Sequence, residues 1–181
     1  MPTQRRFMDI VTIRHAAEAD LPAMLDIYND AILQTTAAYD YTPHTLAMRQ
    51  AWYAQKVAQR FPVLVAVEGD RVVGFASLGP FRAWAAYKYT VENSVYVAAD
   101  CRGRGIGKHL LAALITAARQ MEMHVMIAAI DATNEASLRL HDRFGFVEVG
   151  HLRQVGYKFG RWLDLKLLEL ILETPRSPTE P

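Results

Sequence analysis

Cysteine is nearly absent from this chain, which has one, Cys101, among 181 residues. A single thiol cannot form a disulfide within the chain, so we expect a protein of a reducing compartment, the cytoplasm. Long apolar runs are also missing. No stretch approaches the ~20 residues that a membrane span needs, and Met1–Asp9 has no apolar run behind its two arginines. The sequence therefore predicts neither a membrane segment nor a secretory signal.

An excess of either charge is lacking as well. Twenty lysines and arginines stand against 19 aspartates and glutamates, which gives a formal net charge of +1. This balance gives no electrostatic reason to expect nucleic acid or an anionic membrane as a partner. The six histidines show no metal-ligand spacing, so we predict no metal site. Any anion that the protein binds must be held by a local site.

What the chain does have is a globular composition, with 51% hydrophobic and 22% charged residues. Its length fits one domain, which we assign to residues 1–173. The remainder, Thr174–Pro181, is rich in proline, serine, threonine and glutamate, and is expected to be a flexible tail.

Alternating apolar patterns and helical stripes predict an α/β mixed sheet with helices on its faces. A Gly-Asp pair between the second and third strands predicts a tight hairpin, and the last two strands are expected to pair across Gly156 and Gly160. The polar segment Thr35–Pro43 is interpreted as a substrate-side loop. Strands are expected at 11–14, 63–67, 72–78, 94–97, 125–130, 146–153 and 161–170, and helices at 21–33, 45–59, 105–121 and 134–144.

The most informative stretch is Arg102-Gly103-Arg104-Gly105-Ile106-Gly107-Lys108, which lies between a predicted strand and a predicted helix. A helix start leaves backbone N–H groups unpaired, and its dipole favours negative charge there. Glycines let a phosphate approach the main chain, and three flanking cations add positive charge. A diphosphate is the ligand that such a loop favours. The alternative is a glycine-rich turn that only joins the strand to the helix.

Two common phosphate motifs do not fit this stretch. A P-loop needs serine or threonine after its lysine, but His109 follows Lys108. A dinucleotide fingerprint that starts at Gly103 needs glycine at Lys108. Both interpretations are therefore excluded.

The stretch resembles the Arg/Gln-x-x-Gly-x-Gly/Ala motif of GNAT acetyltransferases, whose loop binds the pyrophosphate of acetyl-CoA. The spacing to Asn134–His141 and to Phe144-Gly145-Phe146 matches the second half of the same cofactor region. Two longer runs, Tyr87–Val97 and Val155–Asp164, are similar to phosphinothricin and methionine sulfoximine acetyltransferases. The resemblance covers nearly the whole chain, from Val11 to Leu170.

The resemblance implies a GNAT-type, mostly antiparallel sheet whose two central parallel strands, at Val95 and Ile127, splay apart to admit acetyl-CoA. The strand Val95–Val97 is then expected to hydrogen-bond the pantetheine arm, and a backbone N–H near Val97 to stabilise the oxyanion. The full set of residues expected to bind acetyl-CoA is Val95, Tyr96, Val97, Arg102, Gly103, Arg104, Gly105, Ile106, Gly107, Lys108, Asn134 and Ser137.

Acetyl transfer to an amine needs a base, because most amines are protonated near neutral pH. Glu92 matches the position of the family's catalytic glutamate; without that match it reads as a solvated residue at a strand end. His141 stands where many GNAT enzymes have a tyrosine. It is either the acid or proton relay for the leaving thiolate, or a partly buried histidine that bonds to backbone.

The acceptor is expected to be a small amino-acid-like molecule. Residues before Glu92 should form one wall of its pocket, with Arg82 pairing a carboxylate or phosphinate unless it is a plain surface arginine. Trp84 stands where phosphinothricin enzymes typically carry a second basic residue, a departure that disfavours phosphinothricin itself. The residues expected to bind the acceptor are Arg82, Trp84, Tyr87 and Tyr39.

Two other functions remain open at this point. The acceptor can be a protein N-terminus or lysine, or the chain can be a non-catalytic acyl-CoA-binding module. The aromatic run from Phe81 to Tyr89 favours a closed pocket over a peptide groove, and the intact Glu92 and Asn134 argue against a non-catalytic module. The resemblance also implies a homodimer, with the C-terminal hairpin near the site.

Overall fold

The computed structural model describes residues 11–180 of the chain. The sequence-based expectation for Met1–Asp9 lies outside these residues. No helix within residues 11–180 is long and apolar enough to cross a membrane.

Residues 11–180 contain seven strands and four α-helices. The strands are β1 (Val11–His15), β2 (Val63–Glu68), β3 (Arg71–Pro80), β4 (Thr90–Val97), β5 (Val125–Asp131), β6 (Val147–Lys158) and β7 (Arg161–Ile171). The helices are α1 (Leu21–Gln34), α2 (Leu46–Ala58), α3 (Ile106–Gln120) and α4 (Glu135–Asp142). Three short 3-10 turns lie at Glu18–Asp20, Ala85–Tyr87 and Ala99–Cys101.

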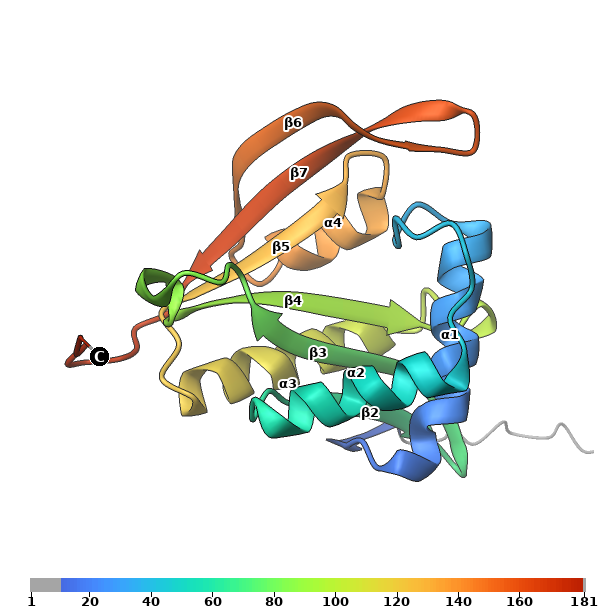
Figure 1. Cartoon of the computed structure of the whole chain (residues 1–181), viewed down its shortest axis with the longest axis horizontal. Coiled ribbons are helices and arrows are strands. Elements are labelled where there is room, and N and C mark those ends of the chain that lie inside the picture. Colours follow the sequence, from blue (N-terminus) through green and yellow to red (C-terminus); the bar gives the residue numbers. More distant parts are fainter. Residues whose placement is uncertain (1–10, 181) are drawn as a thin grey trace, which may run out of the picture.

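The strands form one sheet in the order β1-β2-β3-β4-β5-β7-β6 (Figure 1). Every neighbouring pair is antiparallel except β4 and β5, which are parallel. The predicted mixed, mostly antiparallel sheet is therefore confirmed. The predicted hairpin is also present, since Glu68 pairs with Arg71 across a two-residue turn in which Gly69 has a φ of 59°.

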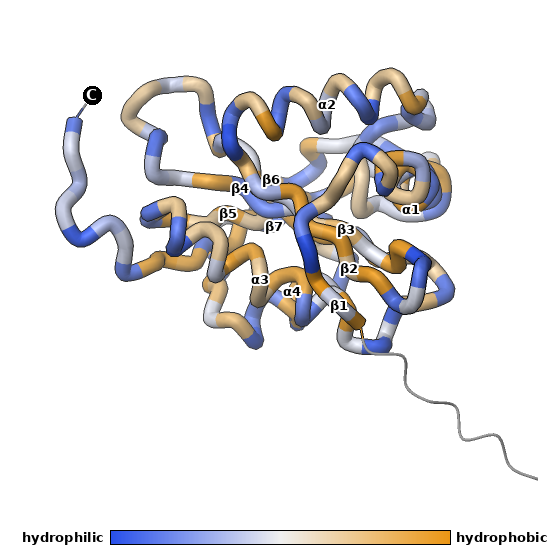
Figure 2. The backbone as a smooth tube through the Cα atoms, turned by 90° about the horizontal axis from the view of Figure 1, so that it is seen from below, coloured by the Kyte–Doolittle hydropathy of each residue, from blue (hydrophilic) through white to orange (hydrophobic). Residues whose placement is uncertain are grey.

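The helices cover both faces of the sheet, with α1 and α2 on one side and α3 and α4 on the other (Figure 2). One face of α3 is fully apolar, and its residues Leu110, Leu111 and Leu114 are completely buried against the sheet. This helix carries the predicted glycine loop at its start. The core beneath it fixes where that loop lies relative to β4.

The C-terminal hairpin differs from the sequence-based expectation. The strand β6 runs on to Lys158, so its turn lies at Phe159-Gly160 and Gly156 stands inside the strand. A register shift between Leu152 and Gly156 takes up the intervening residues. A β-bulge of this kind bends a strand without ending it, which sequence alternation alone does not reveal.

At Gly74 of β3, α3 packs closely on the sheet. A Cβ there would lie 2.9 Å from the carbonyl oxygen of Tyr96 and 3.1 Å from Leu110 Cδ1. Neither neighbour can give way easily, because one is backbone and the other is a fully buried side chain.

We expect Gly74→Ala to lower the free energy of unfolding by about 1–3 kcal/mol through overpacking. Gly150→Ala is the matched control, because a Cβ at that strand glycine meets only Leu167 side-chain atoms at ordinary distances of 3.7 Å and more. Urea unfolding of both variants measures the difference. Equal midpoints would show that the layer of α3 is not tightly packed at Gly74.

Candidate active site

The parallel strands β4 and β5 stay together for only a short stretch. Their register runs from Thr90 opposite Val125 to Glu92 opposite Ile127 and ends there. Beyond this point β4 stays with β3 as far as Val97, whereas β5 stays with β7. The predicted splay is thus present. It leaves the later part of the β4 edge, on the β5 side, without a partner strand.

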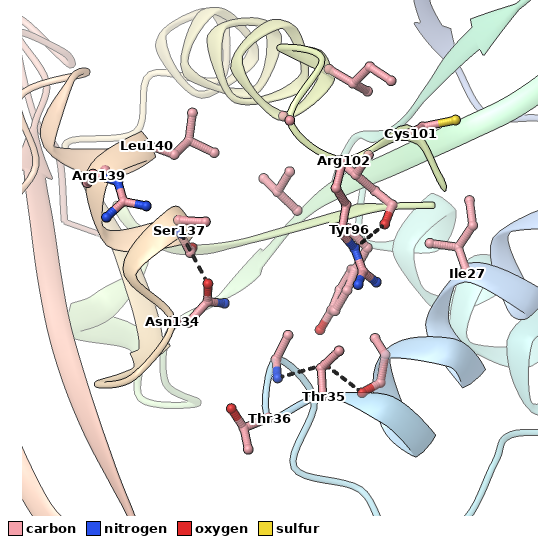
Figure 3. A pocket seen from close by; sticks show the side chains of 18 of the residues that line it. Ile27, Thr35, Thr36, Tyr96, Cys101, Arg102, Asn134, Ser137, Arg139 and Leu140 are labelled. Carbon is pink, nitrogen blue, oxygen red and sulfur yellow. Dashed lines mark hydrogen bonds between the residues drawn. The ribbon is translucent and has the colours of Figure 1, made fainter. Parts of the chain in front are cut away.

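A cavity of about 730 Å³ opens where the strands separate. Its walls are the end of α1 with the residues after it, the last residues of β4, the glycine loop with the start of α3, and α4 with the turn between β6 and β7. Figure 3 shows Tyr96 and Arg102 opposite Asn134 and Ser137 across this space. Of the predicted cofactor residues, the cavity is lined by Val95, Tyr96, Val97, Arg102, Gly103, Gly105, Ile106, Gly107, Lys108, Asn134 and Ser137.

The glycine loop has the backbone that an anion site requires. Gly103 and Gly105 have φ values of 77° and 84°, in the left-handed region where a side chain is strained. Gly105 is the N-cap of α3 and has no side chain, so no side chain caps the first-turn N–H groups of the helix, whose first residues line the cavity. At Gly107 a Cβ would lie 3.3 Å from Leu140 Cδ2, so this glycine also lets α4 approach α3.

The two arginines of the loop differ in direction. Arg102 lines the cavity, while its Nη2 lies 2.9 Å from Asp30 Oδ2 and its Nε donates to the carbonyl of Val97. Arg104, which we expected to bind the cofactor, is not part of the lining. Its guanidinium turns back and forms an ion pair with Glu68 at the end of β2.

Sequence reasoning missed three cations that share the cavity with Arg102 and Lys108. Arg139 and Arg143 come from α4 and its C-terminal end, and Arg161 opens β7. The two α4 arginines are four residues apart and so lie on one helix face. That spacing was visible in the sequence, but only the fold brings this face to the glycine loop.

Asn134 and Ser137 also begin α4. The side chain of Asn134 accepts a hydrogen bond from the backbone N–H of Ser137 at 3.2 Å, which makes it the N-cap of the helix. Both residues line the cavity. Asn134 therefore has a structural role that coexists with the predicted cofactor contact.

His141 is buried and does not line the cavity. Its Nδ1 lies 2.8 Å from the carbonyl of Ser137, and its Nε2 lies 2.9 Å from Nδ2 of Asn93 on β4. Because a carbonyl oxygen can only accept, Nδ1 carries a proton. Burial lowers the pKa of His141, which favours the neutral ring. The structure therefore does not bring His141 to the place expected of an acid, and its contacts match the buried, backbone-bonded alternative.

Glu92 is the last residue of β4 that pairs with β5, at the vertex of the splay. Burial raises the pKa of its carboxyl above the ordinary value, while the nearby charges of Arg82 and Lys56 oppose that effect. Lys56 was missed by sequence reasoning. It reaches from α2 across Gly79, the partner of Glu92 in the ladder, and donates to the carbonyl of Leu78 at 2.7 Å.

The predicted acceptor residues fall into two groups. Arg82, Trp84 and Tyr87 share the segment before β4, where the guanidinium of Arg82 lies 4.7 Å from the centre of the Phe81 ring. The ring centres of Trp84 and Tyr87 are 6.3 Å apart, and the Trp84 side chain is largely exposed. Tyr39 comes from the connection that follows α1, where its hydroxyl lies 3.2 Å from Oδ2 of Asp131 at the end of β5.

A buried arginine, also missed from sequence, lies on the α2 side of the sheet. The guanidinium of Arg49 is 4.3 Å from the ring centre of Tyr28 and 4.7 Å from that of Trp52. Within residues 11–180, its Nε and Nη2 have no hydrogen-bond partner. Cation–π contact is therefore the main interaction that holds this charge in place.

The family model described as Acetyltransferase (GNAT) family matches residues 22–146. An L-methionine sulfoximine/L-methionine sulfone acetyltransferase from Pseudomonas paraeruginosa is 50% identical over 167 residues, which cover 92% of this chain and 97% of that protein.

Solved structures agree. A ribosomal-protein-alanine N-acetyltransferase from Brucella melitensis is 52% identical with a TM-score of 0.88, covering 89% of this chain and 99% of that one. A phosphinothricin acetyltransferase from Sinorhizobium meliloti in complex with acetyl-CoA is 34% identical with a TM-score of 0.90, covering 94% of each chain. Together with the splayed strands and the glycine loop, these similarities show that the chain belongs to the acetyltransferase (GNAT) family and is an acetyl-CoA-dependent N-acetyltransferase.

Proposed function

We propose that this enzyme transfers the acetyl group of acetyl-CoA to the α-amino group of a small amino acid of the methionine sulfoximine, methionine sulfone or phosphinothricin type. The observation that carries the proposal is the placement of a half-buried carboxylate, Glu92, at the vertex where β4 and β5 separate, just before the stretch Val95–Val97 of β4 that lines a cavity rich in phosphate-binding groups. The 50% sequence identity to the methionine sulfoximine/sulfone acetyltransferase from Pseudomonas paraeruginosa supports this acceptor class.

The residues that line the cavity suit the phosphates and the pantetheine arm of acetyl-CoA. The first-turn amides of α3, with Arg102 and Lys108, would hold the pyrophosphate. Arg139, Arg143 and Arg161 add positive charge for the remaining phosphate. The open edge of β4 at Val95–Val97 offers backbone groups to the pantetheine amides, in the manner of an added strand.

Glu92 would act as the base. Its carboxylate takes a proton from the acceptor ammonium, directly or through a water molecule, and the neutral amine then attacks the thioester carbonyl carbon. The new C–N bond gives a tetrahedral oxyanion, which collapses as the C–S bond breaks and the attacking nitrogen loses its second proton. Of the two protons that leave the nitrogen, one ends on the CoA thiolate and the other passes to solvent. Partial burial suits Glu92 to this role, because a raised pKa makes its carboxylate a stronger base.

The acceptor would lie between Glu92 and the segment before β4. The Arg82 guanidinium is close enough to influence the Glu92 carboxyl, so it can pair the acceptor's carboxylate while the amino group points to Glu92. Tyr87 and the exposed Trp84 would border this side. We assign His141 a positioning role, since its two ring nitrogens tie α4 to β4 through Asn93.

A second candidate is acetylation of a protein N-terminus or lysine. It is favoured by the similarity to the Brucella ribosomal-protein-alanine N-acetyltransferase. The two functions differ in the size of the acceptor, so a panel of free amino acids and short peptides separates them.

We also propose that the enzyme is a homodimer that forms through the C-terminal hairpin. The edge strand β6 and the start of β7 expose a row of large apolar side chains, each 42% to 60% accessible, which a second copy of the same edge would cover. These side chains are Val147, Val149, Leu152, Val155, Tyr157, Phe159 and Trp162.

The first test measures release of free CoA thiol from acetyl-CoA with methionine sulfoximine, methionine sulfone, phosphinothricin, common amino acids and peptides. We expect turnover with the sulfoximine or sulfone, and a loss of about 100-fold or more in kcat/KM for Glu92→Gln. Acetyl-CoA binding should be unchanged in that variant, and the exposed Glu18→Gln is the control. Activity confined to peptides would move the function to protein acetylation.

A second test concerns the pH dependence of kcat/KM. Glu92 must be ionised, so the rate falls as the pH drops through its pKa. Lys56→Met removes a positive charge that lowers this pKa, so the acid limb should move to higher pH. The acceptor's own ionisation is common to both enzymes, and Arg119→Gln on the far face of the sheet is the control. A profile that superimposes on the wild type would argue against Glu92 as the base.

A third test is the molar mass in solution by light scattering. The chain mass is 20.4 kDa, so we expect about twice that value for the wild type. Val155→Glu should shift the mass toward the monomer because it buries a charge in the proposed interface. Val57→Glu on α2, where the valine is equally exposed, should leave the dimer intact. A monomeric wild type would refute this assembly.

A further inference from the structure

Lys158, the last residue of β6, carries an ammonium group that is buried yet has no acidic partner within hydrogen-bonding distance among residues 11–180. Only 4% of the residue is exposed. Its Nζ donates to three backbone carbonyls, those of Ile32 at 2.6 Å, Thr35 at 2.9 Å and Ala38 at 2.6 Å. All three donors of the ammonium are therefore used. Burial lowers the pKa of Lys158 because the ammonium loses its hydration, while the charge of Asp40 opposes this effect.

These carbonyls belong to a wall of the active-site cavity. Ile32 lies in the last turn of α1, and the other two lie in the α1–α2 loop, which we define as residues 35–45. The cavity is lined by Gln34, Thr35, Thr36 and Ala37, which lie within the segment 32–38 whose carbonyls Lys158 holds. A side chain at least 120 residues away in the sequence thus fixes the path of this wall.

Two tyrosines of the same loop reinforce the contact with β6. The hydroxyl of Tyr41 donates to the carbonyl of Tyr157, next to Lys158. The ring of Tyr39 packs on Gly156, where a Cβ would lie only 2.8 Å from the ring carbon Cε2. The Tyr39 hydroxyl also lies 3.2 Å from Oδ2 of Asp131 at the end of β5. Gly156 therefore lets the Tyr39 ring pack against β6, where a larger side chain would collide with it.

We propose that Lys158 is a positioning residue that holds the α1–α2 loop closed against the C-terminal hairpin, and that this closure sets the affinity for acetyl-CoA. The lysine touches neither substrate, since its three donors are taken by the loop backbone. Opening of the loop removes one wall of the cavity, and a ligand that needs the closed form then binds more weakly in proportion to the closed fraction. The inference rests on the proposed function only in taking the cavity as the acetyl-CoA site.

The first experiment compares Lys158→Met with Lys166→Met. Lys166 lies on β7 of the same hairpin and pairs with Glu148, away from the loop. We expect Lys158→Met to be cut by chymotrypsin at Tyr39 or Tyr41 about tenfold faster or more, with cleavage sites assigned by mass spectrometry. Its dissociation constant for acetyl-CoA, measured by calorimetry without any acceptor, should rise by a similar factor. Lys166→Met should match the wild type in both.

Thermal unfolding of both variants separates positioning from a general loss of stability. If Lys158→Met is folded at the assay temperature, yet binds acetyl-CoA and resists chymotrypsin as the wild type does, the inference is wrong. If it is folded, its loop opens and its affinity for acetyl-CoA falls, the inference stands. Neither readout depends on the acceptor, so an unexpected acceptor would affect the proposed function alone.

A second experiment leaves Lys158 unchanged, so it can test the inference even if Lys158→Met does not fold. Gly156 has an ordinary φ, so an alanine there meets only the Tyr39 ring. Gly156→Ala should weaken acetyl-CoA binding by displacing that ring, and it should cause no further weakening in a Tyr39→Ala background. Equal effects of Gly156→Ala in both backgrounds would show that the loop's seat on β6 does not control the cavity, and would overturn the inference.

Discussion

The hydrogen bonds between β4 and β5 end after Glu92 and Ile127, and the active site depends on this divergence. Each strand keeps its other neighbour, so the sheet forks without losing its continuity on either side. The fork frees one edge of β4 for a ligand and leaves room for α4 to approach. It also places Glu92 at the vertex, where the carboxylate is partly withdrawn from water.

The fork needs contacts that keep α4 in place beside the open edge. One is the bond between His141 of α4 and Asn93, the first residue of β4 beyond the paired stretch. Another is the close packing of Leu140 over Gly107, which has no side chain to hold the helices apart. His141, which was expected to be an acid, and Gly107, which was expected to be part of the phosphate loop, thus hold α4 close to β4 and α3.

Local signals made the glycine loop, the helix α4 and the β2–β3 hairpin predictable from sequence. In each case the cause lies within a few residues, in a φ value, a cap or a two-residue turn. The direction of Arg104 was not predictable, because its partner Glu68 is 36 residues away and the two meet only through the sheet. The same holds for Lys56 beside Glu92.

The C-terminal hairpin shows most clearly why sequence reasoning stopped short. Gly156 resembles a turn glycine, since glycine is common in turns, but here it makes room for a ring from a loop over 100 residues earlier. A lysine at the end of a strand is usually exposed, yet Lys158 is buried and donates hydrogen bonds to three backbone carbonyls. Because those carbonyls belong to the backbone, the lysine constrains the path of the α1–α2 loop without specifying its side chains. The loop's residues that face the cavity are then free to suit a particular acceptor while the wall itself stays fixed.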